Sequence, residues 1–273
     1  MHSPMCGHAT GEPAEYAEVA QSRGLKGIVI TDHFPLPEDW QRPRMTEAQL
    51  PAYIALVERA REEWHDRLDI RLGLECEYAP GLENWIEKQL ARGDFELVLG
   101  SVHALPKYVK MYWQGDVLAL QKRTFEHLAA AAESGYFQAL AHLDHIRLLA
   151  GEEWDLSRIL DDVLRCLDRV AATGVAVEVN TAGLRSRFLE LYPSRTLLHA
   201  MKERDIPVVV GSDAHRPEHV AHEFEHALDV LAEVGYAAVT IPFAGGSCEV
   251  PIPAARASLG SESLSDGDGS GPS

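Results

Sequence analysis

The chain has 273 residues, 46% of them hydrophobic, which is enough to bury the core of one α/β domain. Its formal net charge of −17, with no long Lys/Arg run, argues against a nucleic-acid-binding surface. There is no apolar stretch of transmembrane length, no signal peptide and no CxxC pair among the four cysteines. We therefore expect a cytoplasmic protein with reduced thiols that binds neither membranes nor nucleic acid.

Short apolar runs alternate with longer amphipathic segments along the chain. The predicted strands cover residues 26–30, 70–75, 95–101, 137–142, 175–180, 206–211 and 236–241. The predicted helices cover residues 12–23, 46–66, 82–92, 117–134, 155–173, 193–203 and 217–234, and several are followed by a glycine. Because the strands are apolar runs rather than alternating ones, they indicate a parallel sheet covered on both faces, as in a barrel or a doubly wound sheet.

The composition divides the chain at one point only. No internal linker interrupts the repeated units, so we expect a single domain over residues 1–257. From residue 258 onward the chain is dominated by Ser, Gly, Asp and Pro. Such a segment cannot bury enough apolar surface to order itself, which predicts a disordered tail over residues 258–273.

Histidine or carboxylate side chains follow most of the predicted strands. In a βα barrel the carboxyl ends of the strands face one pocket. Imidazole and carboxylate are ligands of zinc, manganese and iron, and a two-metal site suits phosphoryl displacement. One histidine at a strand end is more often structural, but several at successive strand ends indicate a metal site. The metal-type and polar residues at these ends are His33, Glu75, His103, His142, Asn180, Asp213 and His215.

Taken together, the motifs resemble those of the PHP phosphoesterases, a family named for polymerase and histidinol phosphatase. The likeness is closest to the histidinol-phosphate phosphatase branch. It implies the family fold, a distorted (β/α)7 barrel of the TIM-like kind. The motifs are His2-Ser3-Pro4-Met5-Cys6-Gly7-His8, Thr31-Asp32-His33, Gly73-Leu74-Glu75, Gly100-Ser101-Val102-His103, His142-Leu143-Asp144, Asn180-Thr181-Ala182-Gly183-Leu184-Arg185 and Gly211-Ser212-Asp213-Ala214-His215.

The beginning of the chain departs from the pattern of this branch. There the first motif opens with HxH, and only its second histidine, His2, is present here. The strand expected before the motif is also absent, so the first strand of the barrel is predicted to be truncated. We expect a start site placed too late or a shortened chain. If the sequence is complete, the metal that His2 shares with Asp213 has one ligand fewer and should bind more weakly than the others.

The resemblance implies two to three divalent metal ions, which could be zinc, manganese or iron. The first would be held by His2 together with Glu75 and Asp213. The second would be held by Glu75, acting as a bridge, together with His103 and His142. The sequence does not choose among the three metals, and it carries no signal for an oligomeric state.

A third ion would be held by His8, His33 and His215. The resemblance then implies that a hydroxide bridging the metals attacks phosphorus, with Glu75 as the bridging carboxylate. Asp213 would be the acid/base near the leaving oxygen, and hydrolysis would be in line without a phosphoenzyme.

Two arginines are candidate phosphate ligands, because a guanidinium can donate two parallel hydrogen bonds. Arg185 follows the Asn180 motif and Arg147 lies five residues after His142. For both arginines a functional role is favoured over a non-functional one. Arg216, next to His215, is interpreted as a solvated residue at a helix start.

The resemblance implies a phosphomonoesterase that converts L-histidinol phosphate to L-histidinol and phosphate in histidine biosynthesis. Three alternatives stay open at this point. One is a PHP phosphoesterase acting on a nucleotide or another small phosphate ester. Another is an amidohydrolase, although no predicted strand ends in the lysine such a site would carry. The last is a metal-binding protein with a decayed site, which the missing histidine favours.

Several further side chains are interpreted as structural. His219, His222 and His226 share one predicted helix and are placed on the surface. Glu77, two residues after Glu75 on the same strand face, is a partner of a ligand or a surface charge. Four further histidines are predicted to face solvent: His65, His127, His145 and His199. Cys6 is predicted to pack beside the site. Asp32 and Asp144 are predicted to orient neighbouring ligands.

Overall fold

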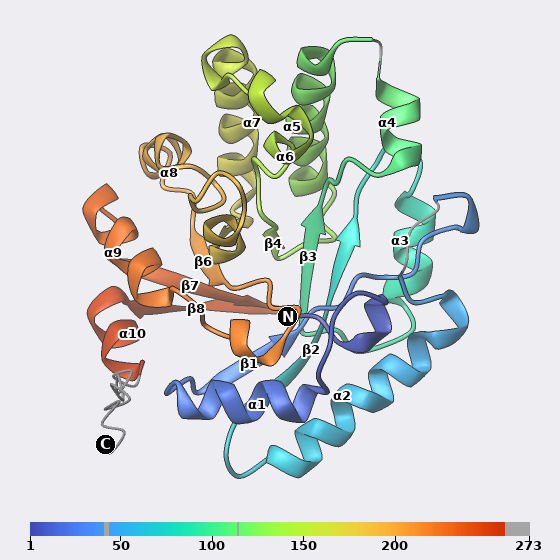
Figure 1. Cartoon of the computed structure of the whole chain (residues 1–273), viewed down its shortest axis with the longest axis vertical. Helices are drawn as coiled ribbons and strands as arrows, with labels where there is room; N and C mark the ends of the chain where they lie inside the picture. The colour runs from blue at the N-terminus through green and yellow to red at the C-terminus, as the bar shows by residue number, and fades with distance from the viewer. Residues whose placement is uncertain (41–43, 114, 260–273) are drawn as a thin grey trace, which may run out of the picture.

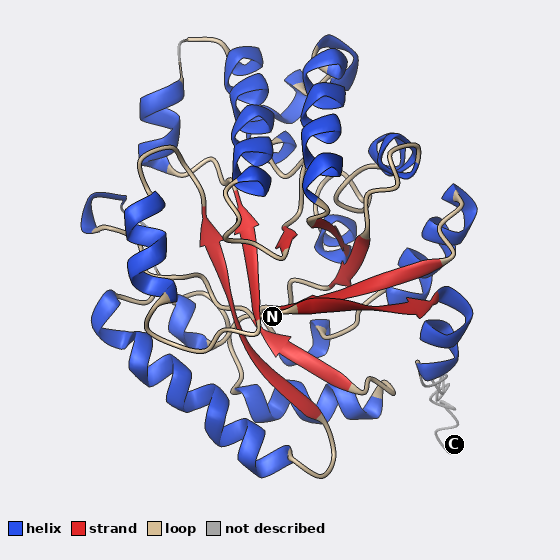
Figure 2. Ribbon diagram, turned by 180° about the vertical axis from the view of Figure 1, so that it is seen from behind, coloured by secondary structure: helices blue, strands red, loops and turns tan. Residues whose placement is uncertain are grey.

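The computed structural model describes residues 1–40, 44–113 and 115–259. The strands lie at the centre and the helices surround them (Figure 1; Figure 2, seen from behind). The predicted tail begins at Ser258, the last residue of α10, and its residues 260–273 lie outside the described residues. Among the described residues, no helix is both long and apolar enough to cross a membrane.

Six of the predicted strands form one parallel sheet whose order follows the chain. The buried strands β3 and β5 have side chains covered on both faces, as their apolar sequences predict. This half-barrel matches the α/β barrel predicted from the sequence. The strands are β1 (Gly27–Ile30), β2 (Asp69–Glu77), β3 (Leu97–Ser101), β4 (Ala139–Leu140), β5 (Ala176–Asn180) and β6 (Val208–Gly211).

The last predicted strand does not join the sheet. β7 (Ala238–Phe243) instead pairs antiparallel with β8 (Gly246–Pro251), a strand that was not predicted, and the hairpin lies beside β6 (Figure 1). The turn between them contains Gly245 at φ +93°, a conformation that glycine adopts without steric cost. The short turn therefore allows β7 to pair with β8, and the periodicity of the sequence does not indicate this pairing.

The first two residues lie between the ends of β1 and β6. The backbone N–H of Thr31 donates to the carbonyl of Met1 at 2.7 Å. On the other side, the N–H of His2 donates to the carbonyl of Ala214 at 2.9 Å. In Figure 1 the N-terminus accordingly lies at the centre of the strands. These two bonds bring His2 to the same end of the sheet as the residues that follow β1 and β6.

The helices pack around the sheet largely where they were predicted. One prediction was wrong: residues 217–234 form a short 3-10 turn and then α9, because Ala221 and Glu223 between them have positive φ angles. The helices are α1 (Pro13–Ser22), α2 (Leu50–Trp64), α3 (Glu83–Leu90), α4 (Pro106–Tyr112), α5 (Val117–Glu133), α6 (Arg147–Ala150), α7 (Leu160–Thr173), α8 (Arg195–Lys202), α9 (Phe224–Val234) and α10 (Ile252–Ser258). The short 3-10 turns are Pro4–Cys6, Glu38–Trp40, Glu47–Gln49, Gly151–Glu153, Leu156–Arg158, Thr181–Arg185 and Pro217–His219.

The core has two parts. The larger part lies between the sheet and the helices, and the smaller part lies inside the curve of the sheet. Successive side chains of a strand point to opposite faces of the sheet. Residues inside the curve of the sheet therefore alternate along each strand with residues packed against the helices. The inner cluster consists of Leu97, Leu99, Ala139, Ala141 and Ala176, with Val29 and Val209 packed against it. These side chains are apolar, and on β5 the polar residues Glu178 and Asn180 follow Ala176 on the same face.

His127 was predicted to face solvent, but it is buried in α5 and its Nδ1 lies 2.8 Å from the hydroxyl of Tyr108. Burial, together with the nearby Arg123, lowers the pKa of His127 to about 4. The same imidazole has a pKa of about 6.5 in an unfolded chain. Between these two values the unfolded state binds the additional proton, so the free energy of unfolding should decrease as the pH falls from 6.5 to 4.

We therefore expect His127→Asn, which keeps an acceptor for Tyr108, to lose less stability than the wild type over this pH range. Denaturant unfolding of both proteins at pH 7 and pH 4.5 measures the difference. An identical loss in the two proteins would contradict the prediction.

Candidate metal centre

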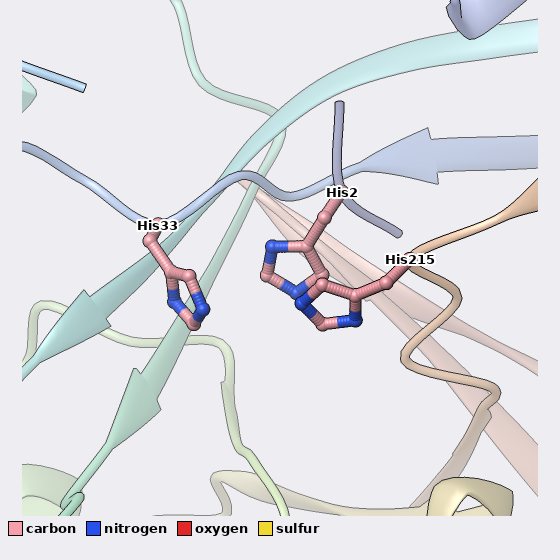
Figure 3. A group of neighbouring side chains, drawn as sticks. All are labelled: His2, His33 and His215. Carbon is pink, nitrogen blue, oxygen red and sulfur yellow. The ribbon is translucent and has the colours of Figure 1, made fainter. Parts of the chain in front are cut away.

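The eight predicted metal ligands lie together at the carboxyl end of the sheet. Figure 3 shows the side chains of His2, His33 and His215 directed toward a common point, although they come from the N-terminus, from the end of β1 and from the loop after β6. The ligand atoms of these three histidines all lie within 4.8 Å of one another. The eight residues are His2, His8, His33, Glu75, His103, His142, Asp213 and His215.

Glu75, near the end of β2, is the centre of this group. Its Oε1 lies 3.0 Å from Nε2 of His142 and 3.5 Å from Nε2 of His103. Its Oε2 lies 2.9 Å from Nδ1 of His33 and 3.4 Å from Nε2 of His2. Each carboxylate oxygen therefore faces two imidazoles, which is the arrangement of a carboxylate that bridges two metal ions.

The remaining residues extend the group away from Glu75. Oδ1 of Asp213 lies 3.1 Å from Nε2 of His2 and 3.4 Å from Nδ1 of His215. The Nε2 atoms of His8 and His215 are 3.1 Å apart. The structure thus pairs His8 with His215 as the predicted third set requires, whereas His33 is closer to Glu75 and His2.

The chemistry of these donors fits divalent metal ions. Oε1 of Glu75 and Nδ1 of His33 are buried, and their short contacts lack hydrogen-bond geometry, so neither atom has a hydrogen-bond partner in the described part of the chain. Burial would raise the pKa of Glu75, but His33 and His142 hold it well below its usual value. Burial and Arg44 lower the pKa of His33. A carboxylate and a neutral imidazole are the forms that bind metal, and a metal would satisfy the unpartnered atoms.

Two of the eight residues have unusual backbone conformations. His142 follows β4 with φ +41°, and Asp213 follows β6 with φ +47°. Left-handed φ angles in residues other than glycine cost about 1–3 kcal/mol and cluster at functional sites. Both residues lie two positions after the end of their strand, and their side chains contact Glu75 and His2 respectively.

Comparison with known proteins agrees with this geometry. The family model described as PHP domain matches residues 1–182. The chain belongs to the PHP family. It is 41% identical over 248 residues to the protein of Deinococcus radiodurans named "Probable histidinol-phosphatase", a match that covers 88% of this chain and 94% of that protein. It is 27% identical to the "Histidinol-phosphatase" of Bacillus subtilis, covering 84% of this chain and 97% of the relative.

Solved PHP structures share the fold. A histidinol phosphate phosphatase from Lactococcus lactis, crystallised with zinc, L-histidinol and phosphate, superposes with a TM-score of 0.76 at 18% identity. The match covers 91% of this chain and 97% of that one. The structure from Listeria monocytogenes named "putative histidinol phosphatase hisK" gives a TM-score of 0.71 at 20% identity, and the match covers 82% of this chain and 97% of that one. The barrel fold implied by the sequence motifs is therefore confirmed.

A second carboxylate of the PHP protein orients His103, as predicted for Glu77. Oε2 of Glu77 lies 2.8 Å from Nδ1 of His103, and Oε1 accepts the backbone N–H of His103 at 2.5 Å. Nη2 of Arg44 donates to the same carboxylate at 3.2 Å. These contacts place a proton on Nδ1 of His103 and leave Nε2, the nitrogen facing Glu75, free to bind metal.

We expect Glu77→Gln to lower metal content and to reduce activity by about 10–100-fold, the usual effect of removing a partner that orients a ligand. A glutamine cannot accept both hydrogen bonds through carboxylate oxygens. Metal per chain by mass spectrometry checks the prediction, with the exposed Glu249→Gln as the matched control. Unchanged metal content and activity in Glu77→Gln would contradict it.

Asp32 and Asp144 differ in what they contact. Asp32 accepts the backbone N–H of Ser3 at 3.2 Å, and its Oδ1 lies 3.4 Å from Nδ1 of His2, so it can orient that histidine. Asp144 was predicted to orient a ligand, but its Oδ2 accepts the N–H of Ser194 at 2.9 Å and lies 3.4 Å from Nη1 of Arg147. Burial raises the pKa of Asp144 to about 6.

The two candidate phosphate ligands have very different surroundings. Arg147 is 1% exposed, and its terminal nitrogens donate to the carboxylate and carbonyl of Glu190 and to the carbonyl of Leu191. These contacts, which the sequence could not reveal, favour a structural role for Arg147. Arg185 is half-buried and donates from Nη2 to the carbonyl of Ser212 at 2.7 Å. Its Nη1 is buried without a partner among the described residues and remains a candidate for phosphate.

His145 is a member of the pocket that the sequence interpretation missed. It was predicted to face solvent, but its ring stacks on His142 with centroids 4.8 Å apart and meets the edge of His103 at 5.2 Å. Burial and the two neighbouring histidines lower its pKa. The tight turn after β4, in which the N–H of His145 donates to the carbonyl of His142, brings the two rings together.

Cys6 was predicted to pack beside the site, and it is fully buried there. Its sulfur and the ligand nitrogens of His8 and His215 all lie within 4.8 Å of one another. Burial raises the pKa of its thiol, but His2 and His8 have the larger combined effect and lower it to about 7. His219 and His222 are half-buried, and both precede α9, so they do not share one helix as predicted.

Proposed function

We propose that the protein is a metal-dependent phosphomonoesterase that hydrolyses L-histidinol phosphate to L-histidinol and phosphate, a step of histidine biosynthesis. The observation that carries the proposal is the Glu75 carboxylate with two imidazoles on each oxygen. The 41% identity to a histidinol-phosphatase relative over 94% of its length supports the choice of substrate.

The site would hold two to three divalent ions, for which zinc is supported by its presence in the Lactococcus lactis structure. Glu75 would bridge two positions, one completed by His103 and His142 and the other by His2 and Asp213. The third position would be held by His8, His33 and His215. Bound ions of this kind supply positive charge to the phosphoryl oxygens and lower the pKa of a coordinated water.

Proton transfer and phosphate binding would be carried out by two further side chains of the pocket, Asp213 and Arg185. Asp213 would exchange a proton with the leaving oxygen, because its carboxylate is more exposed than that of Glu75 and lies beside His215. The unpartnered Nη1 of Arg185 would donate to a phosphate oxygen. With a surface of formal charge −17, an anionic substrate depends on this local positive charge.

Phosphate release from a small panel of esters tests the proposal. We expect purified protein loaded with zinc or manganese to turn over L-histidinol phosphate with a kcat/KM at least about tenfold above that for a nucleoside monophosphate or 4-nitrophenyl phosphate. The variant His103→Ala should be inactive. A preference for another ester, or less than one ion per folded chain, would reject histidinol phosphate or the metal mechanism respectively.

The substitution Arg185→Gln tests the proposed contact of Arg185 with the substrate phosphate. Removing one charge-assisted contact to phosphate costs about 1.5–3 kcal/mol, or a factor of about 10–100 in kcat/KM. We expect the loss to appear mainly in KM. Arg216→Gln, a change of the exposed neighbour of His215, is the matched control. Equal kinetics in Arg185→Gln and Arg216→Gln would contradict the role of Arg185.

A further inference from the structure

Glu178 is a carboxylate buried inside the sheet that has no role in the proposed mechanism. It lies in the middle of β5 and is 6% exposed. Strand alternation places it on the same face as Ala176, a member of the inner cluster, and Asn180. An acidic residue at such a position is rare unless a specific contact offsets its desolvation.

The neighbouring strand leaves space for this carboxylate. Asn180 pairs in register with Gly211 on β6. A β-carbon on Gly211 would lie 1.9 Å from Oε1 of Glu178, far inside any possible contact distance. The absence of a side chain at residue 211 therefore allows Glu178 to lie over β6, two residues before Asp213.

Asn180 connects Glu178 to the metal centre. Its Nδ2 donates to Oε2 of Glu178 at 2.9 Å and lies 3.5 Å from Oδ2 of Asp213, a weak hydrogen bond. Its Oδ1 accepts the N–H of Ala182 at 2.8 Å, which establishes the orientation of the amide. Backbone hydrogen bonds to Tyr192 in both directions hold Asn180 itself in place.

Asp213 needs such a restraint. Its backbone is in the left-handed region at φ +47°, so its conformation depends on its contacts. Oδ1 of Asp213 is directed toward His2 at 3.1 Å and His215 at 3.4 Å. Oδ2 is the oxygen that remains, and Asn180 is the group that faces it.

We infer that Glu178 is a positioning residue for Asp213, acting through the side-chain amide of Asn180 in space provided by Gly211. The inference rests on the proposed function, in which Asp213 binds metal and exchanges a proton. Burial raises the pKa of Glu178 to about 7, and both its ionised and its neutral form offer Oε2 as an acceptor. Without that acceptor the amide of Asn180 is held by the N–H of Ala182 alone, so its contact with Oδ2 of Asp213 is less restrained.

Kinetics of single and double variants test the inference. We expect Glu178→Ala and Gly211→Ala to lower kcat on L-histidinol phosphate by about 10–100-fold, with KM changed less than about twofold. Glu178→Gln should recover most of the activity, because its amide oxygen can accept from Asn180. Asn180→Ala should be as impaired as Glu178→Ala, and the double variant should be no worse than Asn180→Ala alone.

The matched control is Val177→Ala, which removes a buried side chain from the opposite face of β5. It should lower the melting temperature without lowering kcat. A second measurement on the unmodified protein does not depend on any variant folding. The side-chain amide hydrogens of Asn180 should exchange slowly with solvent in NMR spectra.

The inference is overturned by wild-type kcat in Glu178→Ala, by effects of Glu178→Ala and Asn180→Ala that add in the double variant, or by fast exchange of the Asn180 amide. A failure of the proposed function is distinct: the wild type itself would then release no phosphate from L-histidinol phosphate.

Discussion

Replacing Glu75 with glutamine should reduce phosphate release from L-histidinol phosphate by at least about 10³-fold. The proposed metals contribute several kcal/mol to transition-state stabilisation, and each 1.4 kcal/mol corresponds to about a factor of ten. Glu75 is 3% exposed and faces four imidazoles, so a neutral amide in its place cannot bridge two cations. The glutamine has the same shape, so the fold should be retained.

Three measurements on Glu75→Gln separate chemistry from folding. Metal content per chain should fall below that of the wild type, activity should disappear, and the circular dichroism spectrum should not change. Glu18→Gln changes an exposed carboxylate of α1 and should leave all three unaltered. A Glu75→Gln protein with full metal content and activity within tenfold of the wild type would rule out Glu75 as the bridge.

Removal of the metal should abolish activity and also lower stability. A ligand that binds only the folded state at about 1,000 times its dissociation constant stabilises that state by about 4 kcal/mol. For a chain of this size each kcal/mol shifts the melting temperature by about 2–4 °C. We therefore expect chelation to lower the melting temperature by roughly 10 °C, because buried donor atoms such as Oε1 of Glu75 then lack a partner.

Dialysis against a chelator, followed by readdition of zinc, manganese or iron(II) one at a time, measures both effects. Recovery of activity and melting temperature should occur in parallel and should identify the metal that this site prefers. Normal turnover by protein shown to contain no metal would refute the mechanism. A chelated protein with an unchanged melting temperature would show that the site is not coupled to folding.

The sequence located the strands and the candidate metal ligands because both depend on local patterns. Apolar runs a few residues long correspond to buried parallel strands, and the donors follow these runs directly. His33, His103 and His142 could therefore be assigned to one pocket before any coordinates were known. Their convergence follows from the topology, since parallel strands in sequential order bring all their carboxyl ends to the same edge.

The predictions that failed depend on turns and packing contacts that the periodicity of the sequence does not specify. β7 pairs with β8 because a short turn at Gly245 is available to it, although the apolar pattern of β7 is equally compatible with a parallel strand. His127 has the sequence surroundings of a surface residue, but packing of α4 onto α5 buries it against Tyr108. Periodicity alone could determine neither the pairing of β7 nor the burial of His127.

By itself, the sequence predicted which residues are candidate metal ligands and that they lie at one end of a parallel α/β barrel. Only the tertiary structure decided the contacts of these side chains: Glu75 faces a pair of histidines with each of its two oxygens, and Arg147 donates hydrogen bonds to Glu190. The physical reason is that strand ends are specified by local periodicity, whereas the orientation of a carboxylate or guanidinium is set by neighbours from other strands. Glu178 illustrates this, because its position depends on the missing side chain of Gly211 on the next strand.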